Sequence, residues 1–228
     1  MSVNIVDSLC NPGTSDTWPC NANAGQVVSL AAAAVGVSFA MVMYLYKHID
    51  TYPRGNDEMV ALSDTIQAGA ISFLKTEYSY LAVFVAVIAV ILFFMFTFSD
   101  SKVDDYDGLR VVLCFVSGAV LSATAGWLGM KVATDANSRT TQAASEEVGG
   151  LNKALKCAFS GGAVMGFTTV GLGLFGVVVL LLIMLLTNKD PATATAYVNA
   201  SENLAAFGFG ASSIALFAQI GRASCRER

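Results

Sequence analysis

The chain alternates between long apolar stretches and short polar segments. Most of the apolar stretches exceed the roughly 20 residues that an α-helix needs to cross the hydrocarbon core of a bilayer, and the last falls just short of it. The pattern therefore predicts an all-α protein, a polytopic membrane helix bundle with five transmembrane helices. These helices are expected at about residues 25–46, 72–98, 109–132, 155–187 and 203–220.

Composition supports the same class. Hydrophobic residues make up 55% of the chain and charged residues only 13%, a balance that excludes an ordinary soluble domain. The net charge of −4 argues against a nucleic acid as a binding partner. The expected partner of such an apolar chain is the lipid bilayer.

Lysine and arginine predict the orientation, because they accumulate in cytosolic loops. Residues 1–24 contain neither, and the segments near 99–108 and 188–202 contain one each. The loops around 48–70 and 133–154 are flanked by the richer sets, which are Lys47, Arg54, Lys75, Lys131, Arg139, Lys153 and Lys156. We therefore expect these two loops in the cytosol and residues 1–24 on the non-cytosolic side, followed by a retained first helix.

Cysteines divide by their expected location. Cys114 and Cys157 fall in apolar stretches and are interpreted as inert core residues. Cys10 and Cys20 share the non-cytosolic segment, where a disulfide is chemically allowed but is not required by their spacing.

Candidate metal or catalytic side chains all have a simpler structural interpretation. Lys75, Glu77, Tyr78 and Tyr80 open the second apolar stretch, where lysines extend to the interface and tyrosines form an aromatic belt. His48 has no nearby residue that would complete a metal site. Acidic pairs occur at Asp57 and Glu58, at Asp104 and Asp105, and at Glu146 and Glu147, each in a predicted solvated loop.

Small residues recur at helical spacing. Gly118, Ser122 and Gly126 share one face, as do Gly162 and Gly166, and Gly208 to Ser213 form a similar set in the fifth stretch. This spacing favours close helix packing. A phosphate-binding loop is excluded because no Gly-Lys-Ser/Thr ending follows any of these glycines.

Four stretches resemble, in order, the membrane-bound proton-pumping inorganic pyrophosphatases. They are QAGAISFLKTEY at residues 67–78, GWLGMKVATDANSRTT at 126–141, AFSGGAVMGF at 158–167 and GFGASSIALF at 208–217. The resemblance implies an architecture of about sixteen transmembrane helices, of which residues 25–220 supply the first five. It also implies an enzyme, an H+-translocating inorganic diphosphatase that couples hydrolysis of cytosolic pyrophosphate to proton transport.

The resemblance further implies partners and a location. Mg2+ is the implied cofactor, with its ligands on later helices, and a homodimer is the implied assembly. The implied location is the vacuolar or acidocalcisomal membrane of a eukaryote or the plasma membrane of a prokaryote. Because the acidic clusters of the family do not occur in these 228 residues, no catalytic or metal residue is expected here, and this chain alone is expected to be inactive.

The end of the chain departs from the family pattern. Gln219 occupies the position of a family arginine, which makes it the one expected substrate-binding residue. Residues 220–228 are expected to be the translation of a sequencing adapter, and Gln219 is then either native or conceals an arginine. Two alternatives remain open, a noncatalytic multispanning protein such as a receptor, channel or scaffold, and a natural five-helix splice product.

Overall fold

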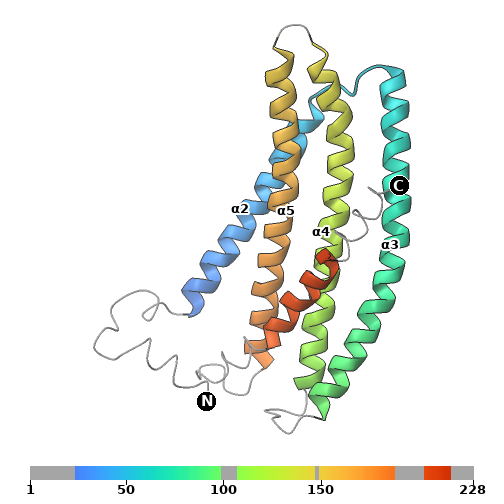
Figure 1. The fold of residues 1–228 in the computed structure, drawn as a ribbon. Helices are drawn as coiled ribbons and strands as arrows, with labels where there is room; N and C mark the ends of the chain where they lie inside the picture. The colour runs from blue at the N-terminus through green and yellow to red at the C-terminus, as the bar shows by residue number, and fades with distance from the viewer. Residues whose placement is uncertain (1–23, 99–106, 147–148, 188–202, 217–228) are drawn as a thin grey trace.

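The computed structural model describes residues 24–98, 107–146, 149–187 and 203–216, and nearly all of these residues are helical (Figure 1). Four helices are long: α2 (Ala24–Asp50), α3 (Asp57–Thr97), α4 (Asp107–Ala144) and α5 (Gly150–Thr187). A shorter apolar helix covers Asn203–Leu216. The four long helices are long and apolar enough to cross a membrane, which confirms the predicted all-α membrane bundle.

The long helices extend well beyond the predicted apolar stretches. α3 has 41 residues and α4 has 38, so at 1.5 Å per residue they are roughly 62 and 57 Å long, about twice the thickness of a hydrocarbon core. Most of the predicted cytosolic loops at 48–70 and 133–154 is therefore helical, and the loop prediction was wrong there. The acidic side chains of Asp57 and Glu58 fit the first turn of α3, where the helix dipole favours negative charge.

The Asn203–Leu216 helix is the described part of the predicted fifth span. It is roughly 21 Å long at 1.5 Å per residue, which is shorter than a hydrocarbon core. The remaining predicted positions, 217–220, lie outside the described residues. So do residues 1–23, with Cys10 and Cys20, and the proposed adapter segment 220–228.

α4 is the central helix of the bundle. It packs along both α3 and α5, and α2 packs mainly against α5. The Asn203–Leu216 helix, drawn in red in Figure 1, crosses α4 near its first half. Three small apolar clusters hold these contacts, centred on Val132 with Val164, on Ala119 with Ile214, and on Cys114 with Phe207. Cys114 and Cys157 are fully buried free thiols, as predicted.

Two glycines let the backbone of the Asn203–Leu216 helix contact the backbone of α4. A Cβ added at Gly118 would lie 2.1 Å from the carbonyl oxygen of Phe207, and one at Gly210 would lie 2.1 Å from that of Phe115. The hydroxyl of Ser122 donates to the carbonyl of Ala211 across the same contact, at 3.1 Å. Close packing at Gly118 is thereby confirmed.

Close packing at three other glycines stays a prediction. A Cβ at Gly162, Gly166 or Gly208 would meet no described atom within 4 Å. On α5 the close approaches between helices include those at Gly161, beside Ala136, at Gly171, beside Ser38, and at Gly176, beside the ring of Phe207.

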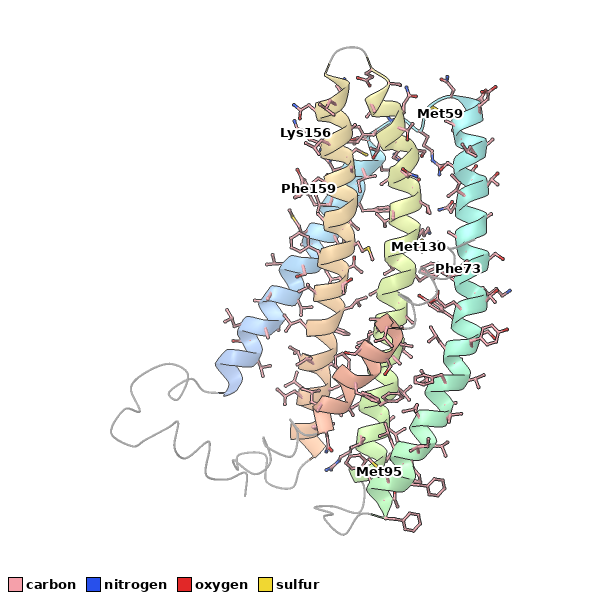
Figure 2. All side chains as sticks on the ribbon, in the orientation of Figure 1. Met59, Phe73, Met95, Met130, Lys156 and Phe159 are labelled. Atoms are coloured by element: carbon pink, nitrogen blue, oxygen red, sulfur yellow. The ribbon has the colours of Figure 1, made fainter. Side chains whose placement is uncertain are left out.

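Charge is concentrated where α2 and α4 end and α3 and α5 begin, which we call the polar end. It is uppermost in Figure 1, and Figure 2 labels Met59, Lys156 and Phe159 on it. Its charged residues are Lys47, Asp50, Arg54, Asp57, Glu58, Asp64, Asp135, Arg139, Glu146, Lys153 and Lys156, while Lys75, Glu77 and Lys131 lie farther along α3 and α4. At the opposite end, the described helices carry only Asp107 and Arg110.

Candidate functional site

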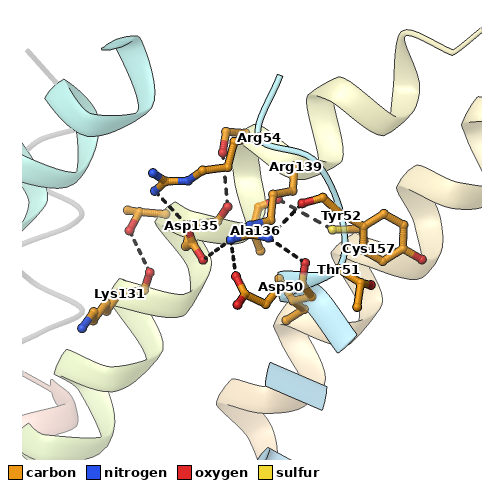
Figure 3. Close-up of polar contacts among 12 residues, drawn as sticks. Asp50, Thr51, Tyr52, Arg54, Lys131, Asp135, Ala136, Arg139 and Cys157 are labelled. Carbon is orange, nitrogen blue, oxygen red and sulfur yellow. Dashed lines mark hydrogen bonds and ion pairs between the residues drawn. The ribbon is translucent and has the colours of Figure 1, made fainter. Parts of the chain in front are cut away.

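A buried arginine organises the polar end. Arg139 lies on the extended part of α4, within the stretch 126–141, and is only 6% exposed. Its Nη1 donates to the carbonyl oxygens of Ile49 at 3.0 Å and Tyr52 at 2.8 Å. Its Nη2 donates to Asp50 Oδ1 at 2.6 Å (Figure 3).

A chain of alternating charges continues from this arginine. Asp135, one turn earlier on α4, lies 3.4 Å from Arg139 Nη2 and accepts a 3.0 Å hydrogen bond from Arg54 Nη2. Arg54 also lies 3.7 Å from Asp64 on α3. We call Asp50, Arg54, Asp64, Asp135 and Arg139 the arginine cluster. It ties together the end of α2, the linker that follows it, the start of α3 and the extension of α4.

The position of Arg139 has a clear electrostatic reason. The last carbonyls of a helix lack partners within the helix and form the negative end of its dipole. Arg139 binds two carbonyls at the end of α2 and a carboxylate beside them, so its guanidinium acts as the cap of that helix. A charge this deeply buried is stable only when it is paired and hydrogen-bonded, and Arg139 is both.

The contacts of the arginine cluster indicate a structural role and not a catalytic one. Its carboxylates are paired with guanidinium groups, which are always charged. Among the residues that the structure describes, no group of three or more His, Cys, Asp or Glu could hold a metal ion. A magnesium ion prefers octahedral oxygen ligands, and this part of the chain does not assemble them.

The remaining sequence candidates are dispersed. His48 lies between Tyr44 and Tyr52, with ring centroids 6.4 and 5.6 Å away and the ring planes tilted against one another. Glu146 pairs with Lys153 across the turn between α4 and α5. Gln219, Asp104, Asp105 and Glu147 lie outside the described residues, so the substrate-binding position at Gln219 stays a prediction.

Sequence reasoning missed the arginine cluster, because it treated Arg139 as one more loop cation. One signal was present in the sequence. Asp135 and Arg139 are four residues apart, the spacing of an ion pair on one helical face. That spacing would have predicted a helix continuing past residue 132.

Comparison with known proteins places this chain in one family. Residues 35–222 match the family described as inorganic H+ pyrophosphatase. The chain is 33% identical over 198 residues to a K+-insensitive pyrophosphate-energized proton pump of Methanosarcina mazei. It is 38% identical over 195 residues to a putative K+-stimulated pyrophosphate-energized sodium pump of Clostridium tetani. Identity to the pyrophosphate-energized membrane proton pump 3 of Arabidopsis thaliana is 30% over 194 residues.

These alignments cover most of this chain but a small part of each relative. They include 86% of the chain for the first two proteins and 81% for the third, yet only 25, 25 and 24% of the relatives themselves. The chain thus spans about a quarter of the length of the pumps it matches. On the match over residues 35–222, this chain belongs to the inorganic H+ pyrophosphatase family.

Proposed function

We propose that this chain is part of a pyrophosphate-energised ion pump, an H+-translocating inorganic diphosphatase. The full-length protein would couple hydrolysis of cytosolic inorganic pyrophosphate to proton transport across its membrane. The observation that carries this proposal is the family match over residues 35–222. Similarity to the pumps of Methanosarcina mazei and Arabidopsis thaliana favours protons, and similarity to the Clostridium tetani protein makes sodium the alternative ion.

The described helices would serve the pump as a scaffold. Pyrophosphate hydrolysis requires several divalent cations and positioned basic groups, because charge spreads over the phosphate oxygens in the transition state. The carboxylates of the arginine cluster are already paired with Arg54 and Arg139. We therefore assign the Mg2+ ions and the hydrolytic step to the part of the relatives that this chain does not match, with Gln219 as the one proposed phosphate-facing residue here.

Orientation and assembly complete the proposal. The polar end would face the cytosol, because its lysines and arginines far outnumber those of the opposite end. The N-terminal segment would then lie on the non-cytosolic side, in a vacuolar or acidocalcisomal membrane if the source is eukaryotic. A homodimer is the proposed assembly.

The test is ion transport by sealed vesicles that contain the full-length protein with its polar end outward. Magnesium pyrophosphate should acidify the vesicle interior, and a sodium pump would instead take up Na+ without acidification. Vesicles carrying only residues 1–228 should do neither and serve as the control. Pyrophosphate-driven uptake by the control vesicles would contradict the assignment of hydrolysis to the unmatched part.

A further inference from the structure

One side of α5 carries large apolar residues at the polar end that the other described helices leave uncovered. Leu151, Leu155 and Phe159 are 86, 66 and 77% exposed. Successive members of this set are four residues apart, so their side chains share one face of the helix. Phe159 lies on the side of α5 that is turned away from α4 (Figure 2).

The same face continues towards the membrane as Gly162, Gly166 and Val170, all of them exposed. A helix turns by about 100° per residue, which puts these three residues and the preceding three within about 100° of arc. A Cβ added at either glycine would meet no described atom within 4 Å. Within a membrane, two glycines four residues apart allow another helix to approach closely. We call this face the α5 stripe, and its members are Leu151, Leu155, Phe159, Gly162, Gly166 and Val170.

The outer part of the α5 stripe lies beyond the reach of lipid. Trp127 and Lys131 mark the membrane interface on α4, with the lysine Nζ 5.5 Å from the ring centroid. Between them, Gly129 faces α5 at Met165, where an added Cβ would lie 2.9 Å from the methionine side chain. Leu155 is ten positions before Met165 and so lies roughly 15 Å farther out at 1.5 Å per residue. The headgroup layer on each side of the hydrocarbon core is only roughly 5–8 Å thick, so Leu155 stands in water unless protein covers it.

These two parts of the α5 stripe define its occupant. Large apolar side chains gathered in water mark a protein contact, and the glycines extend that contact into the bilayer, so the partner is a helix that runs along α5 across the interface. This chain spans only 25% of the pumps that it matches, and their remaining part is joined to the same polypeptide, which keeps its concentration beside α5 high. We propose that the α5 stripe is the docking surface for a later helix of the same polypeptide, supplied by the part that this chain does not match.

This surface goes beyond the proposed pump function, because it rests on packing and membrane depth and involves no hydrolytic residue. It is tested by photo-crosslinking of the full-length protein in its membrane, with p-benzoylphenylalanine in place of Phe159. Illumination should join this position to a segment that follows the matched part of the same polypeptide, without doubling the mass on a denaturing gel. Peptide mapping by mass spectrometry then identifies the helix. Lys153, which lies on the opposite side of α5 with its side chain 52% exposed, is the matched control position and should not be joined to that segment.

Two further variants of the full-length protein test the same contact. Gly166→Leu should lower the crosslinking yield at Phe159 several-fold, because a large side chain forces a closely packed helix away. In the 228-residue chain, side chains added at Gly162 or Gly166 meet open space, so this effect is expected only in the full-length protein. If Gly166→Leu does not fold, Leu155→Cys retains the test. In a background without other cysteines, it should react with an impermeant maleimide several-fold more slowly than Ser145→Cys.

Three results would overturn the docking surface. A crosslinked product of doubled mass would assign the α5 stripe to a second copy of the protein. Crosslinks confined to lipid or to residues 1–228 would show that no later helix lies there. Equal labelling of Leu155→Cys and Ser145→Cys would show that the outer part of the stripe stays in water. Absence of pyrophosphate-driven transport by the full-length protein would refute the pump and leave these measurements unaltered.

Discussion

At the scale of single residues, Arg139 and Arg54 belong to one cluster but occupy different environments. Arg139 is buried and binds two carbonyls and two carboxylates, whereas the side chain of Arg54 is 39% exposed. Arg139→Met removes a buried, paired charge together with its hydrogen bonds to Ile49, Tyr52 and Asp50, and should lower the free energy of unfolding by about 2–4 kcal/mol. Arg54→Met should lower it by about 0–1 kcal/mol, because water screens exposed pairs.

The measurement for both variants is unfolding in mixed micelles with increasing SDS, followed by tryptophan fluorescence. Equal losses for the two arginines would show that Arg139 is not the capping residue of α2.

Gly118 offers a second comparison at this scale. Gly118→Ala would place a Cβ against the carbonyl of Phe207, and overpacking of this kind costs about 1–3 kcal/mol. Gly162→Ala is the matched control on α5, where a Cβ meets open space and alanine is the better helix former by about 1 kcal/mol. The same SDS titration should show a loss for the first variant and no loss for the second. A tolerated Gly118→Ala would mean that the short helix does not approach α4 this closely.

These two glycines also show what the sequence could predict at the residue scale. The spacing of four residues predicts that each glycine lies on a helical face made of small residues. It does not say which face meets another helix, because that depends on the crossing of α4 with the Asn203–Leu216 helix, which is far away in sequence. For the same reason the sequence did not predict the contacts of Arg139 with Ile49 and Tyr52.

At the scale of elements, the extension of α4 beyond the apolar layer changes how topology should be probed. Ser138 on this extension is only 9% exposed, whereas Ser145, just past the end of the helix, is exposed. In a background without other cysteines, Ser145→Cys should react with an impermeant thiol reagent from the cytosolic side, and Ser138→Cys should react much more slowly. Labelling of intact cells or sealed vesicles, before and after the cytosolic face is opened, gives the readout. Rapid labelling of Ser145→Cys from the non-cytosolic side would reverse the proposed orientation.

Hydropathy located the membrane-crossing part of each element but not its ends. The apolar run predicted a helix over residues 109–132. α4 continues for several further turns, to Ala144, because Ala136 and Ala143 are still buried against neighbouring residues. Outside the bilayer such a helix is amphipathic and rich in polar residues, so a search for apolar length ends too early. The start of α3 at Asp57 was missed for the same reason.

At the scale of the whole molecule, the described helices have several small contacts in place of one central core. The arginine cluster holds the polar end, and the crossing at Gly118 lies 21 positions away on α4, roughly 31 Å at 1.5 Å per residue. Effects at such distant sites usually add within about 0.5 kcal/mol. The double variant Arg139→Met with Gly118→Ala should therefore lose the sum of the two single losses in the SDS titration. A marked departure from additivity would show that the two ends are coupled.

The two turns of the polar end differ in what they allow a protein engineer to do. Carbonyls of Ile49 and Tyr52 are held by Arg139, so the turn between α2 and α3 has a fixed length. The turn between α4 and α5 contains Gly149, exposed and at a φ of +74°, with open space around it. An epitope tag inserted beside Gly149 should leave expression and membrane insertion intact, whereas the same tag between Tyr52 and Pro53 should greatly reduce the yield of folded protein. Size-exclusion profiles of the two tagged proteins would show whether each one folds. The turn at Gly149 would then be the place to attach a fluorophore or a purification handle.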